Sequence, residues 1–355
     1  MTAHSNTLKS IIQQYKPALI QKHGDHLLPS QWSAMQAIER CRTAESGELY
    51  VRCIQCSHAH WSPLSCGHRH CPSCQNHEVN QWLDRQKQKL LPVEYFMVTF
   101  TLPAQLRPLA WCKQKTIYRL FFLTIASTLK DFGLNPDKLD GNTGFTAVLH
   151  THNRQLDYHP HIHVVMPGGG INQKRKQWKK LKGKYLFNEF ALAKVFRARF
   201  LAALKELDLK IPANTPDKWA ANVQHVGKGL PALKYLSRYL YRGVISEKNI
   251  VSNKDGQVTF KYVNSTTKKT VYKTLKGEDF LHLVLKHVLP RGFRRVRDYG
   301  FLHANAKRML VLVQLILQVR LSPITKRKRA DFICPVCQSK MQISIIRPAS
   351  RSSPG

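Results

Sequence analysis

Two histidines separated by one residue are the part of this sequence best suited to chemistry. His161 and His163 belong to the run His-Pro-His-Ile-His over residues 159–163. Successive side chains of a β-strand alternate between faces, so these imidazoles would share one face, about 7 Å apart along the strand. Two imidazoles in this arrangement can bind one divalent metal ion. Taken alone, they could equally be structural histidines of a strand.

Two tyrosines further along the chain could provide a nucleophile. Tyr235 and Tyr239 are four residues apart, so on a helix they would lie on one face within about 6 Å of each other. Amphipathic packing of the helix with Leu236 and Leu240 is the alternative interpretation of this pair. Basic residues suited to phosphate contact form a second row on the same helix: Lys234, Arg238 and Arg242.

Together the histidines and tyrosines are typical of a single-strand nuclease. A phenol is a weak nucleophile because its pKa is near 10. A metal ion that binds the scissile phosphate neutralises its charge and aligns the phosphorus for attack. The tyrosine then keeps the 5′ phosphate as an ester and releases a 3′ hydroxyl, which conserves the bond energy for rejoining. A second tyrosine would allow two successive strand transfers.

The charge of the chain indicates a polyanionic partner. Its 355 residues include 56 lysines and arginines but only 21 acidic residues, for a net charge of +35. This excess goes beyond what solubility requires and favours a nucleic acid, rather than a small molecule, as the partner. A solvated basic surface is the alternative. Three consecutive basic residues are candidate DNA contacts: Lys174, Arg175 and Lys176.

Four of the nine cysteines have the spacing of a zinc ribbon. They form two Cys-x-x-Cys pairs separated by 14 residues, Cys53–Cys56 and Cys71–Cys74. Each pair can occupy adjacent corners of a tetrahedron, and the two pairs together would close a four-thiolate site. Because such a site leaves no position for water, we expect its Zn²⁺ to be structural.

Five further residues could contribute to metal binding. Cys41, Cys66 and His70 could form a second zinc site, or they could be buried thiols and a hydrogen-bonded imidazole. Cys334 and Cys337 form a further Cys-x-x-Cys unit near the C-terminus, where no second pair lies close in the sequence. We therefore expect this unit to be an incomplete half site.

The sequence contains no signal for secretion or for a membrane span. Residues 1–10 lack the apolar segment of a signal peptide. The longest apolar run, residues 309–317, is interrupted by Gln314 and is too short to cross a bilayer. We expect a soluble cytoplasmic protein without a membrane partner. In the cytoplasm, paired cysteines more often bind metal than form disulfides.

The hydrophobic periodicity predicts an α+β protein. Helices are expected over residues 8–40 with a break at Pro29, and over 76–91, 113–132, 188–207, 230–241, 277–289 and 303–321. Strands are expected over 93–102, 144–151, 161–166 and 221–226, with a three-stranded meander over 250–275. The strands at 144–151 and 161–166 should form an antiparallel hairpin. This order favours an antiparallel sheet with flanking helices, preceded by a small helical and zinc-binding domain.

The same pattern suggests three successive domains. Residues 1–91 would form the N-terminal helical and zinc-binding domain. Residues 92–321 would form the catalytic domain, including the tyrosine helix, the meander and the last helices. Residues 322–355 would be a basic tail that carries the C-terminal Cys-x-x-Cys unit.

Four motifs in this order resemble those of one family. They are the run Ser-Cys-Gly-His-Arg-His-Cys-Pro over residues 65–72, the strand 96–103, the histidines of 159–163, and Lys-Tyr-Leu-Ser-Arg-Tyr-Leu over 234–240. Over about residues 20–320 the chain resembles the rolling-circle transposases of the IS91 insertion-sequence family. These belong to the HUH (His-hydrophobe-His) endonuclease superfamily, so the resemblance implies an HUH-type sheet and a bacterial, nucleoid-associated enzyme.

The resemblance also implies roles for individual residues. His161 and His163 would bind Mg²⁺ or Mn²⁺, and Tyr239, with or without Tyr235, would be the nucleophile. The superfamily usually has a third polar metal ligand, for which Gln224 and Asp157 are candidates. The DNA partner would be the single-stranded ends of the element.

Two other functions compete with this one. A plasmid replication initiator or relaxase would use the same chemistry, but the zinc module favours the transposase, and no P-loop of a fused helicase is present. A zinc-dependent DNA-binding regulator without catalysis would explain the charge and the cysteines. It would leave the paired histidines and tyrosines without a role.

Overall fold

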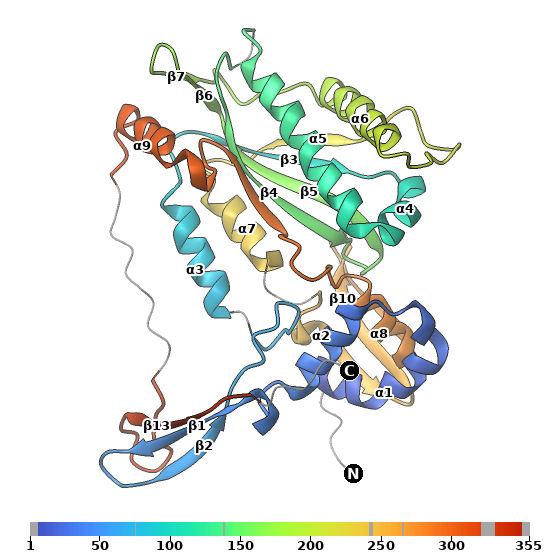
Figure 1. Cartoon of the computed structure of the whole chain (residues 1–355), viewed down its shortest axis with the longest axis vertical. Coiled ribbons are helices and arrows are strands. Elements are labelled where there is room, and N and C mark those ends of the chain that lie inside the picture. The colour runs from blue at the N-terminus through green and yellow to red at the C-terminus, as the bar shows by residue number, and fades with distance from the viewer. Residues whose placement is uncertain are drawn as a thin grey trace. The chain divides into compact units, whose positions relative to one another are not determined.

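The chain folds into two compact units, each built from separate parts of the sequence. The computed structural model describes residues 6–74, 76–137, 139–240, 244–264, 266–320 and 331–349. The first unit comprises residues 1–81, 241–288 and 325–355, and the second comprises residues 82–240 and 289–324. The mixture of helices and antiparallel sheets confirms the α+β class expected from the sequence (Figure 1).

The second unit is built on a five-stranded sheet in which every neighbouring pair is antiparallel. The strand order is β12-β4-β5-β3-β8. The strands are β3 (Tyr95–Thr101), β4 (Gly144–His152), β5 (Tyr158–Pro167), β8 (Ala221–His225) and β12 (Val296–Gly300). The expected hairpin is confirmed as β4 and β5, and β5 lies at the centre of the sheet.

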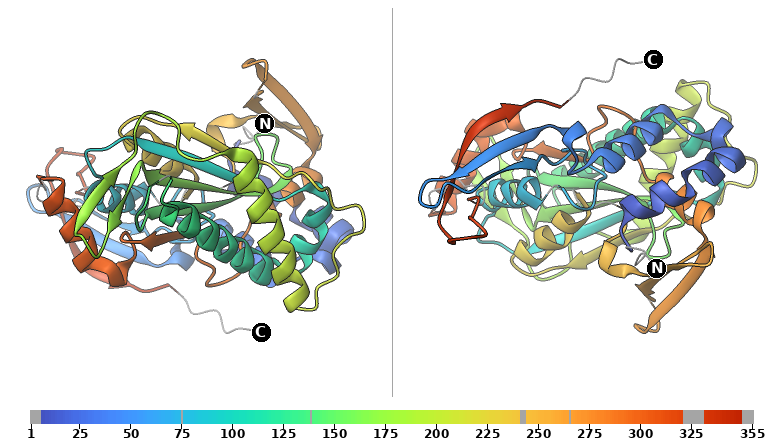
Figure 2. Two further views of the ribbon diagram at one scale, coloured as in Figure 1. Left: turned by 90° about the horizontal axis from the view of Figure 1, so that it is seen from above. Right: turned by 90° about the horizontal axis from the view of Figure 1, so that it is seen from below.

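One face of this sheet is covered by the main hydrophobic core. The helices α5 (Gln114–Leu134) and α6 (Glu189–Glu206) lie side by side over it (Figures 1 and 2). Phe100 of β3 packs against Phe196 of α6, whose ring also stacks on Phe121 of α5. Ile162 and Val164 of β5 are fully buried in the same core. Burial of this apolar face is what turns the alternate residues of β5 toward the other side.

The opposite face of the sheet carries the helix α7 (Leu230–Leu240), which contacts β4 and β5. Figure 1 shows α7 behind the sheet and α5 in front of it. The second unit also contains the helices α4 (Arg107–Cys112) and α9 (Lys307–Ile316) and a small hairpin of β6 (Gly169–Asn172) and β7 (Gln177–Lys180). The helix α3 (Asn76–Lys87) connects the N-terminal part of the first unit to the second.

The first unit combines helices with two small sheets. Its helices are α1 (Leu8–His23), α2 (Pro29–Arg40) and α8 (Gly277–Leu285). The meander of β9 (Ile250–Lys254), β10 (Gln257–Val263) and β11 (Thr270–Lys276) packs on α8, where Phe260 contacts Phe280. Gly277 lets α1 approach closely, since a Cβ at this position would lie 2.3 Å from the ring of Tyr15. The Tyr15 hydroxyl donates to Asn253 Oδ1 at 2.8 Å, which ties α1 to the meander.

The second sheet of the first unit joins two distant parts of the chain. It contains β1 (Glu48–Cys53), β2 (Ala59–Pro63) and β13 (Met341–Arg347) in the order β13-β1-β2. Short 3-10 helices complete the described elements of the two units: Gly24–His26, Ala44–Ser46, Ala104–Leu106, Glu247–Asn249 and Ala304–Ala306.

These units differ from the three successive ranges expected from the sequence, 1–91, 92–321 and 322–355. The meander and α8 were expected with the catalytic sheet but pack on the N-terminal helices. The C-terminal segment was expected to be a tail, but its strand β13 pairs with β1. Both differences come from contacts between residues far apart in the chain, which local periodicity does not encode.

Candidate active site

Three histidines converge on the face of the sheet opposite the core. His161 and His163 share this face of β5, as the alternation of the strand predicts. His150 of β4 lies directly opposite His161 in the register of the hairpin. The ring centroid of His150 is 5.1 Å from that of His161 and 4.6 Å from that of His163. One nitrogen from each ring lies within 4.8 Å of the others, so the three histidines can coordinate a single metal ion.

The Nδ1 atoms of His161 and His163 already have hydrogen-bond partners. His161 Nδ1 lies 2.7 Å from the carbonyl oxygen of His159, which can only accept, so Nδ1 carries the proton and Nε2 keeps its lone pair. His163 Nδ1 lies 2.8 Å from the hydroxyl of Thr99 on the neighbouring strand β3. When Nδ1 donates to this hydroxyl, Nε2 of His163 is likewise available as a ligand.

Burial keeps these imidazoles neutral. It lowers the pKa of His161 to about 4 and the pKa of His163 to about 3, from an ordinary value of 6.5. Burial, followed by the charges of His163 and His161, also holds the pKa of His150 well below its usual range. A neutral imidazole is the form that binds metal, so the triad is ready to act as a ligand set at neutral pH.

The donor set decides which ion fits best. Within the described part of the chain, the donor set is three imidazole nitrogens without a carboxylate. Such a set suits a transition-metal ion better than Mg²⁺, which prefers oxygen ligands. Three protein ligands also leave coordination positions open for a phosphate oxygen or water. The histidines therefore fit a catalytic rather than a purely structural metal.

The helix α7 brings a tyrosine to the triad. The ring centroid of Tyr235 is 5.9 Å from that of His163, with the two rings nearly perpendicular. Leu233 and Leu236 of α7 are buried and anchor the helix, whereas Lys234 is exposed. Tyr239 and Arg238 also belong to α7, but their side chains, and the whole of Arg242, lie outside the described residues.

His150 is the site residue that sequence reasoning missed. Asp157, one of two candidates for a third ligand, instead accepts from the Asn153 side chain at 3.0 Å within the hairpin turn. The second candidate, Gln224, is on β8, two strands from β5. It pairs with Met97, whereas the residue of β3 that lies opposite His163 is Thr99. The register of the expected hairpin could have revealed His150, because a histidine near the end of one strand faces the motif on the other.

The cysteines are grouped differently from the expectation. The single site expected from Cys53, Cys56, Cys71 and Cys74 is not formed: Cys53 and Cys56 lie where β1 turns into β2, whereas Cys71 and Cys74 follow β2, and the two pairs belong to different clusters. The structure brings together a first cluster, Cys41, Cys66, Cys71 and Cys74, and a second cluster, Cys53, Cys56, Cys334 and Cys337. His70 is buried but is not among the ligand atoms of either cluster. The C-terminal unit is therefore not an isolated half site.

The first cluster has the dimensions of a four-thiolate zinc site. Cys74 Sγ lies 3.4 Å from Cys41 Sγ and 3.6 Å from Cys66 Sγ, and Cys71 Sγ lies 3.7 Å from Cys41 Sγ. A zinc ion with Zn–S bonds of 2.3 Å holds its sulfurs about 3.8 Å apart, whereas a disulfide brings them to about 2 Å. The sulfur spacing therefore fits zinc and excludes disulfides.

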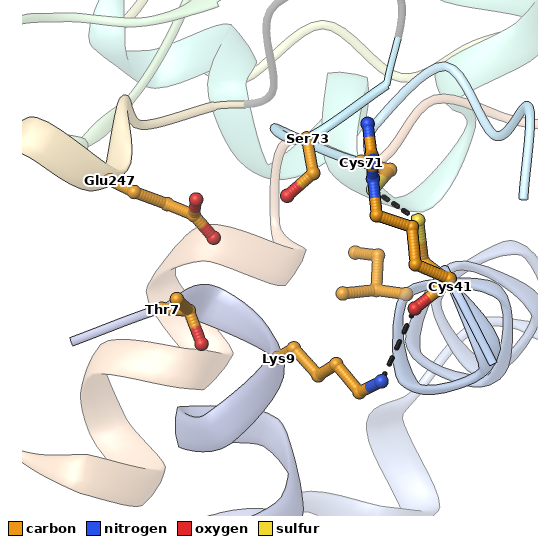
Figure 3. Close-up of a pocket in the computed structure, with 8 residues that line it drawn as sticks. Thr7, Lys9, Cys41, Cys71, Ser73 and Glu247 are labelled. Atoms are coloured by element: carbon orange, nitrogen blue, oxygen red, sulfur yellow. Dashed lines mark hydrogen bonds between the residues drawn. The ribbon is translucent and has the colours of Figure 1, made fainter. Parts of the chain in front are cut away.

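A cavity of about 200 Å³ lies beside this cluster (Figure 3). Thr7, Lys9 and Glu247 line one part of it, and Cys41 and Cys71 line another. The Lys9 ammonium donates to the carbonyl oxygen of Cys41 at 3.2 Å, which ties α1 to the end of α2. All lining residues come from the first unit, and none of the three histidines is among them.

The basic residues expected to contact DNA lie on different elements. Lys174, Arg175 and Lys176 form the exposed turn between β6 and β7, and Lys234 is exposed on α7. Their part in DNA binding stays a prediction. No helix in the described part of the chain is both long and apolar enough to cross a membrane.

The fold and the site define an α+β protein that combines clustered cysteines with a histidine–tyrosine centre. Residues 144–309 match the model of a family described as "Putative transposase", and residues 11–102 match that of a "Transposase zinc-binding domain" of IS91 type.

Two relatives are similar over most of the chain. "Putative transposase y4qJ" of Sinorhizobium fredii is 34% identical over 317 residues, which cover 82% of this chain and 79% of the relative. "Transposase for insertion sequence element IS801" of Pseudomonas savastanoi pv. phaseolicola is 27% identical over 284 residues, 74% of this chain and 68% of the relative. No solved structure gives a significant match. The chain belongs to the IS91 family of insertion-sequence transposases and has an N-terminal zinc-binding domain.

Membership of this family has two direct consequences. A transposase binds and cleaves DNA, in agreement with the strongly basic composition. The zinc-binding domain, together with the cysteine clusters, supports structural zinc.

Proposed function

We propose that the protein cleaves and rejoins single-stranded DNA at the ends of its element by HUH-type, rolling-circle chemistry. The observation that carries this proposal is the contact between the Tyr235 ring and His163 within a triad of neutral histidines. A nucleophilic phenol beside a divalent metal site is what tyrosine-mediated phosphoryl transfer requires.

The metal ligands in this proposal are His150, His161 and His163. When bound, Mn²⁺ or Mg²⁺ would neutralise charge on the scissile phosphate and stabilise the charge that develops in the transition state. The backbone carbonyl of His159 and the hydroxyl of Thr99 orient the rings of His161 and His163 toward this ion.

Each step of the reaction breaks one phosphodiester bond and forms another. The tyrosine loses its phenolic proton and its oxygen attacks the phosphorus, while the bond from phosphorus to the 3′ oxygen breaks. The released 3′ oxygen takes up a proton, and the 5′ phosphate stays on the enzyme as a phosphotyrosine ester. Attack by another 3′ hydroxyl reverses these steps and rejoins the DNA without any nucleotide cofactor.

Both tyrosines of α7 are assigned as nucleophiles in this proposal. The contact with His163 supports Tyr235, and the spacing of one helical turn supports Tyr239 on the same face of the helix. Two nucleophiles would allow the cleavage of donor and target strands without release of an intermediate. The exposed Lys234, together with Arg238 and Arg242, would hold the DNA backbone nearby.

A strand-cleavage assay tests this function. Single-stranded oligonucleotides of the element ends are incubated with Mn²⁺ or Mg²⁺ and either the wild-type protein or the Tyr235→Phe, Tyr239→Phe and double variants. A covalent adduct with the 5′-phosphate fragment is expected for the wild type, reduced in each single variant and lost in the double variant. Tyr272→Phe, which changes an exposed tyrosine of β11, is the matched control and should retain full adduct formation.

Three results would contradict the proposal. Adduct formation that survives in the double variant would exclude both tyrosines as the nucleophile. DNA binding without cleavage of either strand, with either ion, would instead favour the zinc-dependent regulator. Cleavage at a plasmid origin in preference to the element ends would favour the replication initiator or relaxase.

We also infer that the first cysteine cluster, Cys41, Cys66, Cys71 and Cys74, binds the structural zinc of the N-terminal domain. Its sulfur spacing and its position within residues 11–102 both support this assignment. All four positions of the metal are filled by thiolates, so this zinc would stabilise the fold and take no part in cleavage.

A further inference from the structure

The C-terminal Cys-x-x-Cys unit is not explained by the function proposed above. Cys334 and Cys337 lie outside both ranges that match the family models, 11–102 and 144–309. In the structure they belong to the second cysteine cluster, together with Cys53 and Cys56 from the other end of the chain. The four thiols come from two turns that are about 280 residues apart in the sequence.

Strand pairing brings the two turns together. The strand β13 runs antiparallel to β1, with Cys53 opposite Met341 at one end and Glu48 opposite Arg347 at the other. The Arg347 guanidinium also donates to the Glu48 carboxylate at 2.8 Å and lies over the Trp61 ring at 4.2 Å. This register places each Cys-x-x-Cys turn at the same end of the sheet.

The sulfur atoms are at zinc-binding distances. Cys53 Sγ lies 3.4 Å from Cys337 Sγ, and Cys56 Sγ lies 3.5 Å from Cys334 Sγ. All four lie within 4.8 Å of one another. These contacts cross from one turn to the other and are close to the edge of about 3.8 Å expected for a tetrahedral four-thiolate zinc site. They are far longer than a disulfide bond of about 2 Å.

The two turns have the same backbone conformation. The N–H of the first cysteine donates to the carbonyl five residues later in both, from Cys53 to His58 at 2.7 Å and from Cys334 to Ser339 at 2.8 Å. The residue after the second cysteine is left-handed in both, with φ of 58° at Ser57 and 60° at Gln338. Neither residue is a glycine, so each turn holds a conformation that is costly for its sequence.

This shared conformation directs backbone N–H groups at sulfur. The N–H of His58 donates to Cys56, and the N–H of Ser339 donates to Cys337, so the second cysteine of each turn is approached in the same way. The Gln55 N–H also lies 3.4 Å from Cys53 Sγ. Backbone N–H groups aimed at sulfur are contacts that orient a thiol ligand and hold it in place. The Ser339 hydroxyl links the two turns by donating to Gln55 Oε1 at 2.6 Å.

Apolar packing around this sheet is sparse. The buried cluster consists of Val51, Cys53, Cys334 and Met341, so half of it is made of the ligands themselves. Ile343, Ile345 and Ile346 of β13 are exposed rather than buried. Small modules with so little core depend on a metal or a disulfide for stability, and the sulfur distances exclude the disulfide.

We propose that Cys53, Cys56, Cys334 and Cys337 bind a second structural Zn²⁺, in a ribbon assembled from both ends of the chain. Zinc binding by four thiols releases four protons and leaves no open coordination position, so the ion locks β13 onto β1 and performs no chemistry. This site is independent of the proposed DNA cleavage, because its ligands and those of the histidine triad belong to different units.

The zinc content of the full-length protein tests this site. The count is made by plasma mass spectrometry in a His161→Ala/His163→Ala background, because the imidazole triad can also bind zinc. Two zinc ions per chain are expected in this background, and one after the further change Cys334→Ser/Cys337→Ser. Cys112→Ser, which removes an exposed cysteine that belongs to neither cluster, is the matched control and should keep both ions.

Thiol alkylation of the wild-type protein provides a readout that needs no variant. Cys53, Cys56, Cys334 and Cys337 should resist iodoacetamide until a strong chelator is added, and should then react together. A count that does not fall after Cys334→Ser/Cys337→Ser would overturn the proposal, whereas a background count of one that falls to zero would support this site and remove the zinc inferred at the first cluster. Rapid alkylation of Cys334 and Cys337 in zinc-loaded protein would overturn it as well.

Discussion

His150 of β4 lies directly opposite His161 of β5, with 5.1 Å between their ring centroids. The hairpin register therefore determines whether the triad forms, because a slip of one residue would turn His150 toward the core face. The opposite face of both strands is buried, through Leu149 on β4 and Ile162 on β5. Hydrophobic packing on one side of the hairpin therefore sets the geometry of the three histidines on the other.

Replacement of His150 should weaken metal binding. His150→Ala removes one of three imidazoles, and we expect the affinity of the apoprotein for Mn²⁺ to fall by about 10- to 100-fold or more. Isothermal titration measures this change. His159→Ala is the matched control, because His159 lies in the same hairpin and contacts Arg107 through its side chain, while its carbonyl would still accept from His161. Equal affinities for wild type and His150→Ala would remove His150 from the ligand set.

The hydroxyl of Thr99 should matter through the orientation of His163. Thr99→Val keeps the shape of the side chain but removes its hydrogen bond to His163 Nδ1. We expect the Mn²⁺ concentration needed for half-maximal cleavage to rise by about 10- to 100-fold, with a loss of roughly 1 kcal/mol in the free energy of unfolding. Thr99→Ser retains the hydroxyl and should restore the metal dependence. If Thr99→Ser shifted the metal dependence as much as Thr99→Val, a change in packing rather than the lost hydrogen bond would explain the effect.

The sequence was sufficient to predict the two histidines, because the alternation of a strand is local. The hydrophobic residues at positions 162 and 164 predict which face is buried, and the structure confirms that His161 and His163 share the other. The tyrosine helix was predicted in the same way from its own periodicity. Each of these predictions needed only residues within about ten positions of one another.

The grouping of the cysteines could not be assigned from the sequence for the opposite reason. A Cys-x-x-Cys spacing predicts that two thiols can share a metal, but not which other pair completes the site. Here Cys56 lies beside Cys334, and that contact depends on the pairing of β13 with β1. The small hairpin β6–β7 and the strand β12 were also missed, since strands of four or five residues are too short to show a clear alternating pattern.

The stability of the first unit should depend on pH through His282. The ring of His282 stacks on that of His23 at 4.0 Å, and burial, followed by the charge of His23, lowers its pKa to about 4. Lys286 and His26 also disfavour its protonation, while Asp279 favours it. Between pH 6.5 and 4 the unfolded chain binds a proton that the folded chain does not, so stability should fall as the pH falls through this window.

Thermal melting at pH 7.5 and pH 5 checks this dependence. The melting temperature of the wild type should fall more between these values than that of His282→Gln, which has no imidazole to protonate. His303→Gln changes an exposed histidine of the other unit and should melt like the wild type at both values. If the His282→Gln and wild-type profiles were parallel, another group would be responsible for the acid sensitivity.

The residue between His161 and His163, the proposed metal ligands, should contribute to stability rather than to chemistry. Ile162 is fully buried against the core, on the face opposite His161 and His163. We expect Ile162→Ala to lower the free energy of unfolding by about 2–5 kcal/mol and Ile162→Val by about 0.5–1.5 kcal/mol, because the larger truncation leaves a cavity. Urea unfolding of the metal-free protein measures both, with the exposed Lys174→Ala expected to stay within about 0.5 kcal/mol of the wild type.

Because Ile162→Val keeps the strand in place, it should retain cleavage at low temperature. A Val variant that folds normally but loses its Mn²⁺ affinity would show that Ile162 acts on the metal site directly.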